Sequence, residues 1–371
     1  MTTVLVSGGA GYIGSHTVVQ LLEAGLDVII VDNLCNAKYS VLERIRRITG
    51  RAPVFYQTDV RDRPALREIF NRHAVDAVMH FSGLKAVGES VSHPLRYYDH
   101  NVAGSIALLA EMEHAGIKRL VFSSSATVYG DPSSVPVKEN APLSARNPYG
   151  QSKLTVELML RDIVAADPTW KVAVLRYFNP VGAHSSGLIG EDPEGVPNNL
   201  MPYVAQVAGG RLERLSVFGK DYPTRDGTGV RDYIHVVDLA RGHLQALAAL
   251  PGVDGMLIAN LGTGRGYTVL EMVQAFERAS GREISLRIAP RRPGDVAQCY
   301  ADAGYAGQVL GWQARLDIDA MCADTWRWQQ WANDNLYPAP DSDPAGVPLQ
   351  ATLPFDSGCP TASSPAWGKP C

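Results

Sequence analysis

A glycine-rich turn near the N-terminus constrains the fold of this chain more than any other feature. The apolar run Val4–Ser7 predicts a buried strand, and Gly9, Gly11 and Gly14 follow it in a GxGxxG pattern that opens a helix. Glycines at these positions permit a tight turn, close approach of a pyrophosphate to backbone N–H groups, and close packing of helix on strand. The second predicted strand ends in Asp32, where a carboxylate can accept both ribose hydroxyls and repel a 2′-phosphate. The pattern therefore predicts a dinucleotide site that favours NAD over NADP.

Short β-branched runs alternate with helical patterns over the first half of the chain. The runs are Val4–Ser7, Val28–Asp32, Val54–Thr58, Ala77–Phe81, Leu120–Ser124 and Val172–Tyr177. Such alternation is typical of βαβ units, in which helices cover both faces of a parallel sheet. Between the first two runs, Val18, Leu21 and Leu22 have helical spacing, and Gly25 is a plausible helix stop. We predict an α/β protein whose residues 1–180 form a Rossmann-type doubly wound parallel sheet that binds NAD.

The composition of the sequence and the length of its predicted elements change after about residue 180. Loops rich in Gly, Pro and Asn are broken by short elements, which suits a smaller C-terminal α/β lobe over residues 181–337 that binds the substrate. Residues 338–371 carry Pro, Ser, Asp and Gly with few large apolar side chains, too few to offset the entropy of ordering the chain. We therefore expect a disordered tail there.

Composition excludes several classes of partner. Basic and acidic residues are interspersed and the net charge is −4, so no strong field attracts nucleic acid or an anionic membrane surface. No run approaches the roughly 18 apolar residues of a membrane helix, and the N-terminus lacks the pattern of a signal peptide. The five cysteines are scattered without CxxC spacing, which predicts free thiols and no metal site. We expect a cytoplasmic protein with neither nucleic acid nor membrane as partner.

Tyr149 and Lys153 are candidates for proton transfer. They are four residues apart, so on a helix they share one face. A Tyr acts as acid and base only if its pKa falls from about 10 toward ambient pH, and a nearby cation favours the phenolate. Alone the pair is a weak signal, because similar pairs on solvated helix faces are common. It gains weight from Ser125 at a predicted strand end, whose alternative role is to cap a turn.

These residues resemble a known family. Ser125, Tyr149, Lys153 and the spacing of Gly8, Gly11 and Gly14 are similar to the catalytic set and glycine turn of the extended short-chain dehydrogenases/reductases. Longer segments resemble the UDP-sugar 4-epimerases of that family: Phe81–Ser90, Leu175–Ala183, Pro197–Tyr203 and Gly229–His235. The resemblance spans about residues 3–337. It implies that Ser125 hydrogen-bonds the reacting hydroxyl, that Tyr149 is the base and acid, and that Lys153 holds the nicotinamide ribose and lowers the Tyr149 pKa.

The resemblance also implies two sets of binding residues. NAD would contact Gly8, Gly11, Tyr12, Ile13, Gly14, Asp32, Asn33, Leu34, Cys35, Asn36, Ala37, Asp59, Val60, Phe81, Ser82, Gly83, Leu84, Lys85, Asn101, Tyr149, Lys153 and Phe178. A UDP-hexose would contact Lys85, Ser125, Tyr149, Tyr177, Asn179, Asn198, Asn199, Leu200, Ser216, Val217, Phe218, Arg231, Arg292, Asp295 and Cys299. Because the net charge is negative, a diphosphate needs placed cations, and Arg231 and Arg292 offer bidentate forks.

The implied reaction is the interconversion of UDP-galactose and UDP-glucose through a transient 4-keto sugar. NAD begins and ends the cycle oxidised, so it must stay bound. Epimerases of this kind carry a bulky or a small residue where Cys299 lies, so we hypothesise that N-acetylated UDP-hexoses are accepted too, the alternative being that Cys299 is only a small buried hydrophobe. The resemblance also implies a homodimer that pairs through helices near Val102–His114 and Ser152–Ala166.

Three alternatives stay open at this point. A nucleotide-sugar dehydratase would carry an Asp–Glu pair where Ala126 and Thr127 stand, and the missing carboxylates argue against it. Another nucleotide-sugar oxidoreductase would consume nicotinamide stoichiometrically. A silent NAD-binding module would keep the glycines and Asp32 but would not need Tyr149 and Lys153, which are present.

Overall fold

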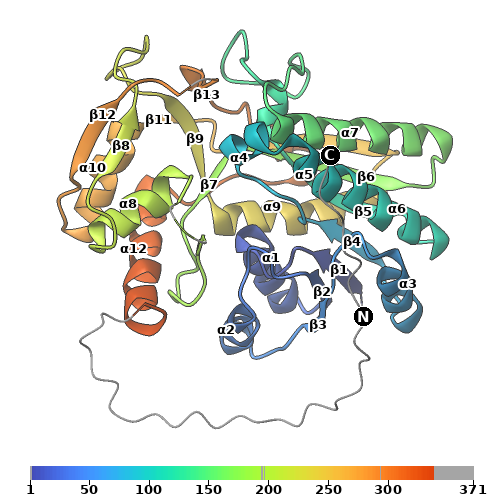
Figure 1. The fold of residues 1–371 in the computed structure, drawn as a ribbon. Helices are drawn as coiled ribbons and strands as arrows, with labels where there is room; N and C mark the ends of the chain where they lie inside the picture. Colours follow the sequence, from blue (N-terminus) through green and yellow to red (C-terminus); the bar gives the residue numbers. More distant parts are fainter. Residues whose placement is uncertain (1, 194, 196, 293, 338–371) are drawn as a thin grey trace, which may run out of the picture.

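The computed structural model describes residues 2–193, 195, 197–292 and 294–337, and the predicted tail 338–371 lies outside the described residues. In this part of the chain a seven-stranded parallel sheet, in the order β10-β6-β5-β4-β1-β2-β3, forms the larger layer (Figure 1). Its strands are β1 Thr3–Ser7, β2 Asp27–Asp32, β3 Val54–Gln57, β4 Ala77–His80, β5 Arg119–Ser125, β6 Lys171–Tyr177 and β10 Met256–Leu261. The six strands predicted from the sequence are therefore confirmed, each within one residue at either end.

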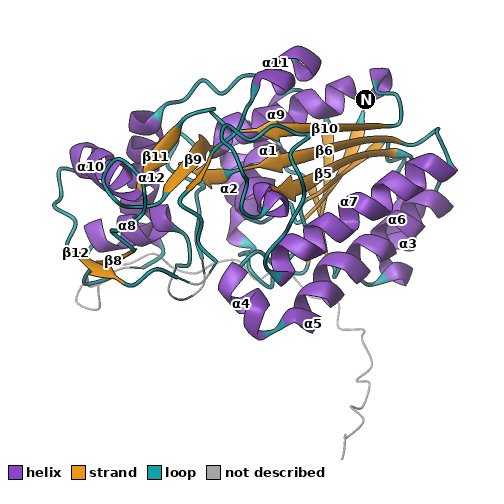
Figure 2. Ribbon diagram, turned by 90° about the horizontal axis from the view of Figure 1, so that it is seen from above, coloured by secondary structure: helices purple, strands orange, loops and turns teal. Residues whose placement is uncertain are grey.

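Helices cover both faces of this sheet, which confirms the predicted doubly wound fold. Figure 2 shows α3 (Arg63–Arg72), α6 (Gly104–His114) and α7 (Pro148–Ala166) along one face, with α1 (Tyr12–Glu23) and α9 (Val236–Ala249) along the other. Successive residues of β1 point to opposite faces: Val4 and Val6 pack in the core under α1 and α9, and Leu5 packs in the core under α3, α6 and α7. Burial on both faces explains why the strands read as continuous apolar runs.

The chain reverses its direction of travel across the sheet at β1, since β2 lies on one side of it and β4 on the other. Such a switch point opens a crevice at the carboxyl ends of the strands, where α/β proteins bind ligands. The other helical segments that connect these strands are α2 (Ser40–Thr49), α4 (Val87–Ser92), α5 (Pro94–Tyr97), a π-helix Tyr98–Ala103 and a 3-10 helix Ala126–Tyr129.

A smaller lobe packs beside this edge, at the left of Figure 1. Its strands are β7 Asn179–Val181, β8 Leu215–Phe218, β9 Val230–His235, β11 Gly266–Thr268, β12 Leu286–Ala289 and β13 Gln298–Cys299. Its helices are α8 Leu200–Ala208, α10 Val269–Ser280 and α12 Ile318–Asn335, while the 3-10 helix Leu250–Gly252 and α11 Gly304–Leu310 lie nearer the main sheet. Apolar side chains of α8, α10, α12, β8 and β9 share one core.

Not every residue after 180 belongs to the smaller lobe. Helix α9 packs on α1, and β10 extends the main sheet by pairing with β6. The buried side chains of Ala259 and Leu261 complete the core under α1. Segments of the main sheet and of the smaller lobe therefore alternate along the sequence after residue 180. The assignment of NAD binding to residues 1–180 and of substrate binding to residues 181–337 stays a prediction. No helix among the described residues is both long and apolar enough to cross a membrane.

Candidate active site

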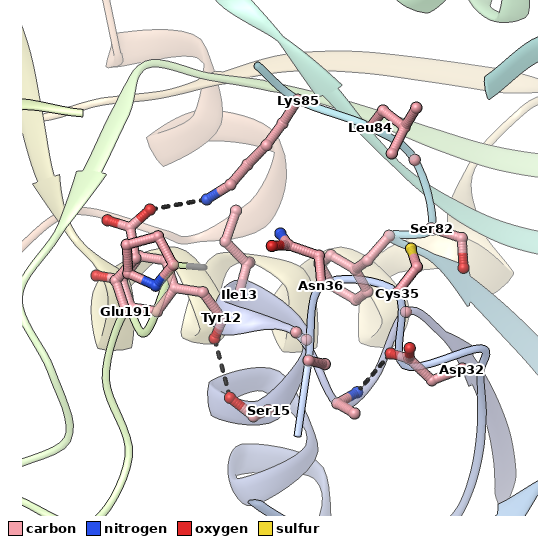
Figure 3. Close-up of a pocket in the computed structure, with 18 of the residues that line it drawn as sticks. Tyr12, Ile13, Ser15, Asp32, Cys35, Asn36, Ser82, Leu84, Lys85 and Glu191 are labelled. Carbon is pink, nitrogen blue, oxygen red and sulfur yellow. Dashed lines mark hydrogen bonds and ion pairs between the residues drawn. The ribbon is translucent and has the colours of Figure 1, made fainter. Parts of the chain in front are cut away.

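A cavity of about 500 Å³ lies at the switch point. It is lined by the glycine turn, by the segments that follow β2, β3 and β4, and by α7. The smaller lobe contributes residues 190–193 together with Asn198, Asn199 and Pro202. Figure 3 shows Asp32 at one end of the cavity and Glu191 at the other, with Tyr12, Ile13 and Asn36 between them. The cavity thus joins both halves of the chain in one site.

The glycine turn is shaped by close backbone approach. Gly8 has φ +73°, and a Cβ built on Gly14 would lie 2.1 Å from the Gly8 carbonyl oxygen. Helix α1 begins directly after Gly11, so its first N–H groups face the cavity edge, which is the arrangement that holds a phosphate. This cradle fits the pyrophosphate of a dinucleotide.

Asp32 closes the other side of this turn. Its carboxylate accepts hydrogen bonds from the backbone N–H groups of Ala10 (3.0 Å) and Leu34 (2.9 Å). Burial raises the Asp32 pKa, and these two hydrogen bonds act in the opposite direction. Asp32 lines the cavity, where a carboxylate suits a ribose diol.

Most of the predicted NAD contacts lie together. Nineteen of the predicted residues line the cavity: Gly8, Gly11, Tyr12, Ile13, Gly14, Asp32, Asn33, Cys35, Asn36, Ala37, Asp59, Val60, Phe81, Ser82, Gly83, Leu84, Lys85, Tyr149 and Lys153. Of the described residues in the prediction, Leu34, Asn101 and Phe178 are not part of that lining. Asn101 instead holds the lining in place, because it accepts from Leu84 N–H (2.7 Å) and donates to Leu84 C=O (3.0 Å).

Tyr149 and Lys153 lie on the first turns of α7. Asn147 starts this helix by accepting from Gly150 N–H at 2.8 Å. Both side chains are buried, and the Lys153 ammonium donates to the Ser123 carbonyl at 2.8 Å. Burial lowers the Lys153 pKa to about 8. Burial raises the Tyr149 pKa, with the Ser125 hydroxyl acting against it; the predicted lowering by Lys153 stays a prediction.

Ser125 ends β5 beside Tyr149. Its hydroxyl accepts from the Thr127 N–H (3.2 Å) and hydroxyl (3.0 Å), so the turn-capping role proposed as its alternative is present. The two roles are compatible, because a hydroxyl that accepts these bonds still has a proton to donate. Parallel pairing sets Ser125 opposite Tyr177, which lines the cavity.

The predicted substrate residues fall into two groups. Lys85, Tyr149, Tyr177, Asn198 and Asn199 line the cavity. The others, although described, lie outside that lining: Ser125, Asn179, Leu200, Ser216, Val217, Phe218, Arg231, Arg292, Asp295 and Cys299.

Several members of the second group contact one another in the smaller lobe. Cys299 pairs with Arg231 across β13 and β9. The Arg292 guanidinium lies 4.7 Å from the centre of the Phe218 ring and forms an ion pair with Asp295 at 3.0 Å. Both arginines also lie close enough to Tyr233 on β9 for their charges to act on its pKa.

An acidic loop of residues 190–193 also lines the cavity and was not predicted from the sequence. Glu191 forms an ion pair with Lys85 (2.8 Å), as Figure 3 shows, and accepts from Asn199 (2.9 Å). Asp192 forms an ion pair with Lys38 (2.7 Å), whose ammonium also donates to the Tyr337 hydroxyl (2.6 Å). A Glu–Asp pair in a glycine- and proline-rich loop was the available signal, but its two lysine partners are more than 100 residues away in the sequence.

Comparison with known proteins shows which family the chain belongs to. A family model described as GDP-mannose 4,6 dehydratase matches residues 5–325. The UDP-glucose 4-epimerase of Bacillus subtilis (strain 168) is 58% identical over 334 residues, which cover 90% of this chain and 98% of that protein. The chain belongs to the UDP-glucose 4-epimerase family. Family members are extended short-chain dehydrogenases/reductases, as the sequence predicted.

Solved structures of the epimerase family have the same fold. The UDP-glucose-4-epimerase of Stenotrophomonas maltophila, with bound NAD and formylated UDP-arabinopyranose, has a TM-score of 0.88 and 56% identity, covering 90% of this chain and 99% of that one. The enzyme of Bifidobacterium longum, in complex with NAD+ and UDP, has a TM-score of 0.87 and 52% identity, covering 91% and 99%. The epimerase-family fold therefore extends over nearly all the described residues.

Proposed function

We propose that this protein is an NAD-dependent UDP-glucose 4-epimerase that interconverts UDP-galactose and UDP-glucose through a transient 4-keto sugar. The observation that carries the proposal is the position of Tyr149 and Lys153, which are buried and line the same cavity as the glycine turn and Asp32. Relatives at 56–58% identity bear the name of this enzyme. A silent binding module would have no use for this pair.

The chain's own residues would hold NAD tightly. The glycine turn and the start of α1 bind the pyrophosphate, Asp32 binds the adenosine ribose, and Lys153 binds the nicotinamide ribose. When bound, NAD supplies the site that accepts a hydride from the sugar C4 and returns it. Because the cofactor ends the cycle oxidised, the enzyme needs no added nucleotide.

Tyr149 is the residue that moves the proton. Its phenolate form takes the proton of the sugar 4-hydroxyl and its phenol form returns it, while Ser125 donates a hydrogen bond to the reacting oxygen. The Lys153 cation lies one helical turn away and favours the phenolate once it leaves the Ser123 carbonyl for the ribose.

The smaller lobe would bind the UDP-hexose. Arg231 and Arg292 neutralise the diphosphate, and Asn179, Asn198 and Asn199 offer amides to the sugar and phosphates. Cys299 is small and buried. A small residue at this position would leave room for an N-acetyl group beside the sugar. We propose UDP-N-acetylglucosamine and UDP-N-acetylgalactosamine as further substrates.

Dehydration is the competing reaction within this fold family, given the description of the matching family model. The two residues after Ser125 are Ala126 and Thr127, and the Thr127 hydroxyl is bonded to Ser125. Neither can act as the extra acid or base that elimination of water requires. Epimerisation is therefore the reaction these residues support.

Two α6 and α7 side chains favour a homodimer. Ile106 is 49% exposed and Leu158 is 41% exposed, and their helices lie side by side in Figure 2. Pairing of this face with a second copy would bury both residues. We also propose a cytoplasmic location, on the sequence pattern alone.

The test of the proposed function is a comparison of two variants with the parent protein. Tyr149→Phe and Lys153→Met should both lose epimerisation of UDP-galactose by about 100-fold or more, since the first removes the proton-transferring hydroxyl and the second removes the cation that favours its ionised form. Tyr149→Phe should keep its bound NAD. Equal turnover by Tyr149→Phe and the parent protein would overturn the assignment.

A further inference from the structure

Three consecutive serines at the end of β5 meet three side chains of α7. The helix presents Tyr149, Lys153 and Glu157 at intervals of four residues, so all three lie on the face toward the sheet. The Ser123 carbonyl accepts a hydrogen bond from Lys153 at 2.8 Å, and the Ser124 hydroxyl donates one to Glu157. A hydrogen bond with the Ser125 hydroxyl acts to lower the pKa of Tyr149. Two of these helix residues belong to the proposed reaction. Glu157 has no part in that reaction.

Glu157 is a buried carboxylate with a fixed place. Its side chain is 4% exposed and that of Arg176 is 2% exposed. The guanidinium holds both carboxylate oxygens, with Nε to Oε1 at 3.0 Å and Nη2 to Oε2 at 2.6 Å. Arg176 lies opposite Ser124 in the pairing of β5 with β6. A bidentate pair of this kind holds both carboxylate oxygens in a fixed position.

We infer that Glu157 is a positioning residue for the reaction: its carboxylate, one helical turn beyond Lys153 on the same buried side of α7, keeps the Lys153 ammonium charged. The inference rests on the proposed function, because it concerns the cation that serves Tyr149. Burial alone disfavours the ammonium, and Glu157 is the charge that acts in the opposite direction. Without that charge, more of the enzyme would carry a neutral amine where the reaction needs a cation.

Other ionisable groups packed around Lys153 do not supply this charge. His80 on β4 is buried, and the Lys153 charge helps to lower its pKa to about 3, so it is neutral. Tyr149 on α7 and Tyr177 on β6 have raised pKa values and are neutral as well. His100, which lines the same cavity from the π-helix, has a lowered pKa, and Arg176 is a cation.

Other charged side chains that line the cavity form ion pairs with one another. Glu89 on α4 and Arg96 on α5 pair with each other, as do Lys85 and Glu191. Among the described residues, only the Glu157 charge acts to raise the Lys153 pKa, against the larger lowering by burial.

The first test is the pH dependence of kcat for the holoenzyme with UDP-galactose. The parent protein should lose activity as pH rises through about 8, because Lys153 then loses its proton. In Glu157→Gln this loss should begin about one pH unit lower, since removal of a negative charge lowers the pKa of a neighbouring ammonium. At pH 6.5 the variant should stay within a few-fold of the parent, and near pH 8.5 it should be about tenfold slower. Glu157→Asp keeps the charge and should restore the parental profile.

Glu111→Gln is the matched control. Glu111 is also a fully buried carboxylate, held by Arg63 (2.8 Å) and Arg67 (2.7 Å), but it lies on α6 away from the cavity. A general loss of packing would affect both glutamine variants, whereas only Glu157→Gln should shift the pH at which kcat begins to fall. Activity lost in equal proportion at every pH in Glu157→Gln, or an equal shift in Glu111→Gln, would overturn the inference.

A double-mutant cycle separates this inference from the proposed function. Unfolding of the parent, Glu157→Gln, Lys153→Met and the double variant is followed by urea at pH 7. A coupling that disappears by pH 10, where Lys153 is neutral, supports the inference even if no epimerisation is found. Additive effects at pH 7 would contradict it whatever the activity.

Discussion

The carboxylate of Asp32 accepts a hydrogen bond from the backbone N–H of Ala10 at 3.0 Å, which ties the end of β2 to the glycine turn after β1. A second bond, from Leu34 N–H, fixes the other oxygen. The acid that selects the cofactor is thus also part of the frame that shapes the pyrophosphate cradle. Changing its charge without removing its oxygen separates these two roles.

Asp32→Asn should weaken discrimination between NAD and NADP. The amide oxygen can still accept from Ala10, but the variant no longer repels a 2′-phosphate. We expect the ratio of NADP to NAD affinity to rise on the order of tenfold, which corresponds to about 1.4 kcal/mol. Competitive binding to the protein freed of cofactor measures this ratio. Glu89→Gln, which also removes a cavity carboxylate, should leave the ratio unchanged.

Gly14→Ala should lose bound NAD and stability together. The added methyl would lie 2.1 Å from the Gly8 carbonyl oxygen, so the turn must open. Such overpacking typically costs about 1–3 kcal/mol. Gly88→Ala is the control, because the space around that position is open. NAD released by acid and the free energy of urea unfolding report the two effects. A Gly14→Ala protein with parental NAD content would show that the turn tolerates a side chain.

Acid should destabilise the protein below pH 6.5 through three buried histidines. Burial lowers the pKa of His16 and His80 to about 3 and that of His243 to about 4. The unfolded chain binds protons at these residues as pH falls through 6.5, while the folded chain does not. Stability is therefore full above that pH and decreases toward pH 4, by about 1.4 kcal/mol per pH unit and per histidine.

His243→Leu isolates one of these contributions. Its Nε2 has no hydrogen-bond partner among the described residues, and its ring packs on Phe81 at 4.7 Å, so an apolar replacement suits the site. Urea unfolding between pH 6.5 and pH 5 should show a shallower slope for the variant. His93→Leu, at an exposed position, should keep the parental slope.

Cys299→Tyr should suppress turnover of UDP-N-acetylglucosamine while sparing UDP-glucose. Cys299 is 9% exposed and packs with Phe178 and Val128, so a ring at this position has to project into neighbouring space. Cys299→Ala keeps the position small and should retain both activities. The ratio of kcat/KM for the two substrates is the measurement. Equal ratios in the Tyr and Ala variants would remove Cys299 from the determinants of specificity.

The sequence predicted what local patterns encode. Glycine spacing, the apolar runs and the strand-end position of Asp32 depend on neighbours a few residues away, and the structure confirms the fold they imply. The pairing of Glu157 with Arg176, and that of Glu191 with Lys85, depends on which strands and loops become adjacent after folding. The pairing of β10 with β6 in the main sheet also depends on which segments become adjacent after folding. Such contacts have no signature in spacing, so sequence reasoning could not place them.

The most direct measurement is incubation of the purified protein with UDP-galactose, without added nucleotide, while UDP-glucose and the absorbance of NADH are both followed. Formation of UDP-glucose with no net NADH is the predicted result, since Tyr149 and Lys153 lie in the cavity whose glycine turn fits a resident NAD. Absence of UDP-glucose from protein that carries its NAD would contradict the account.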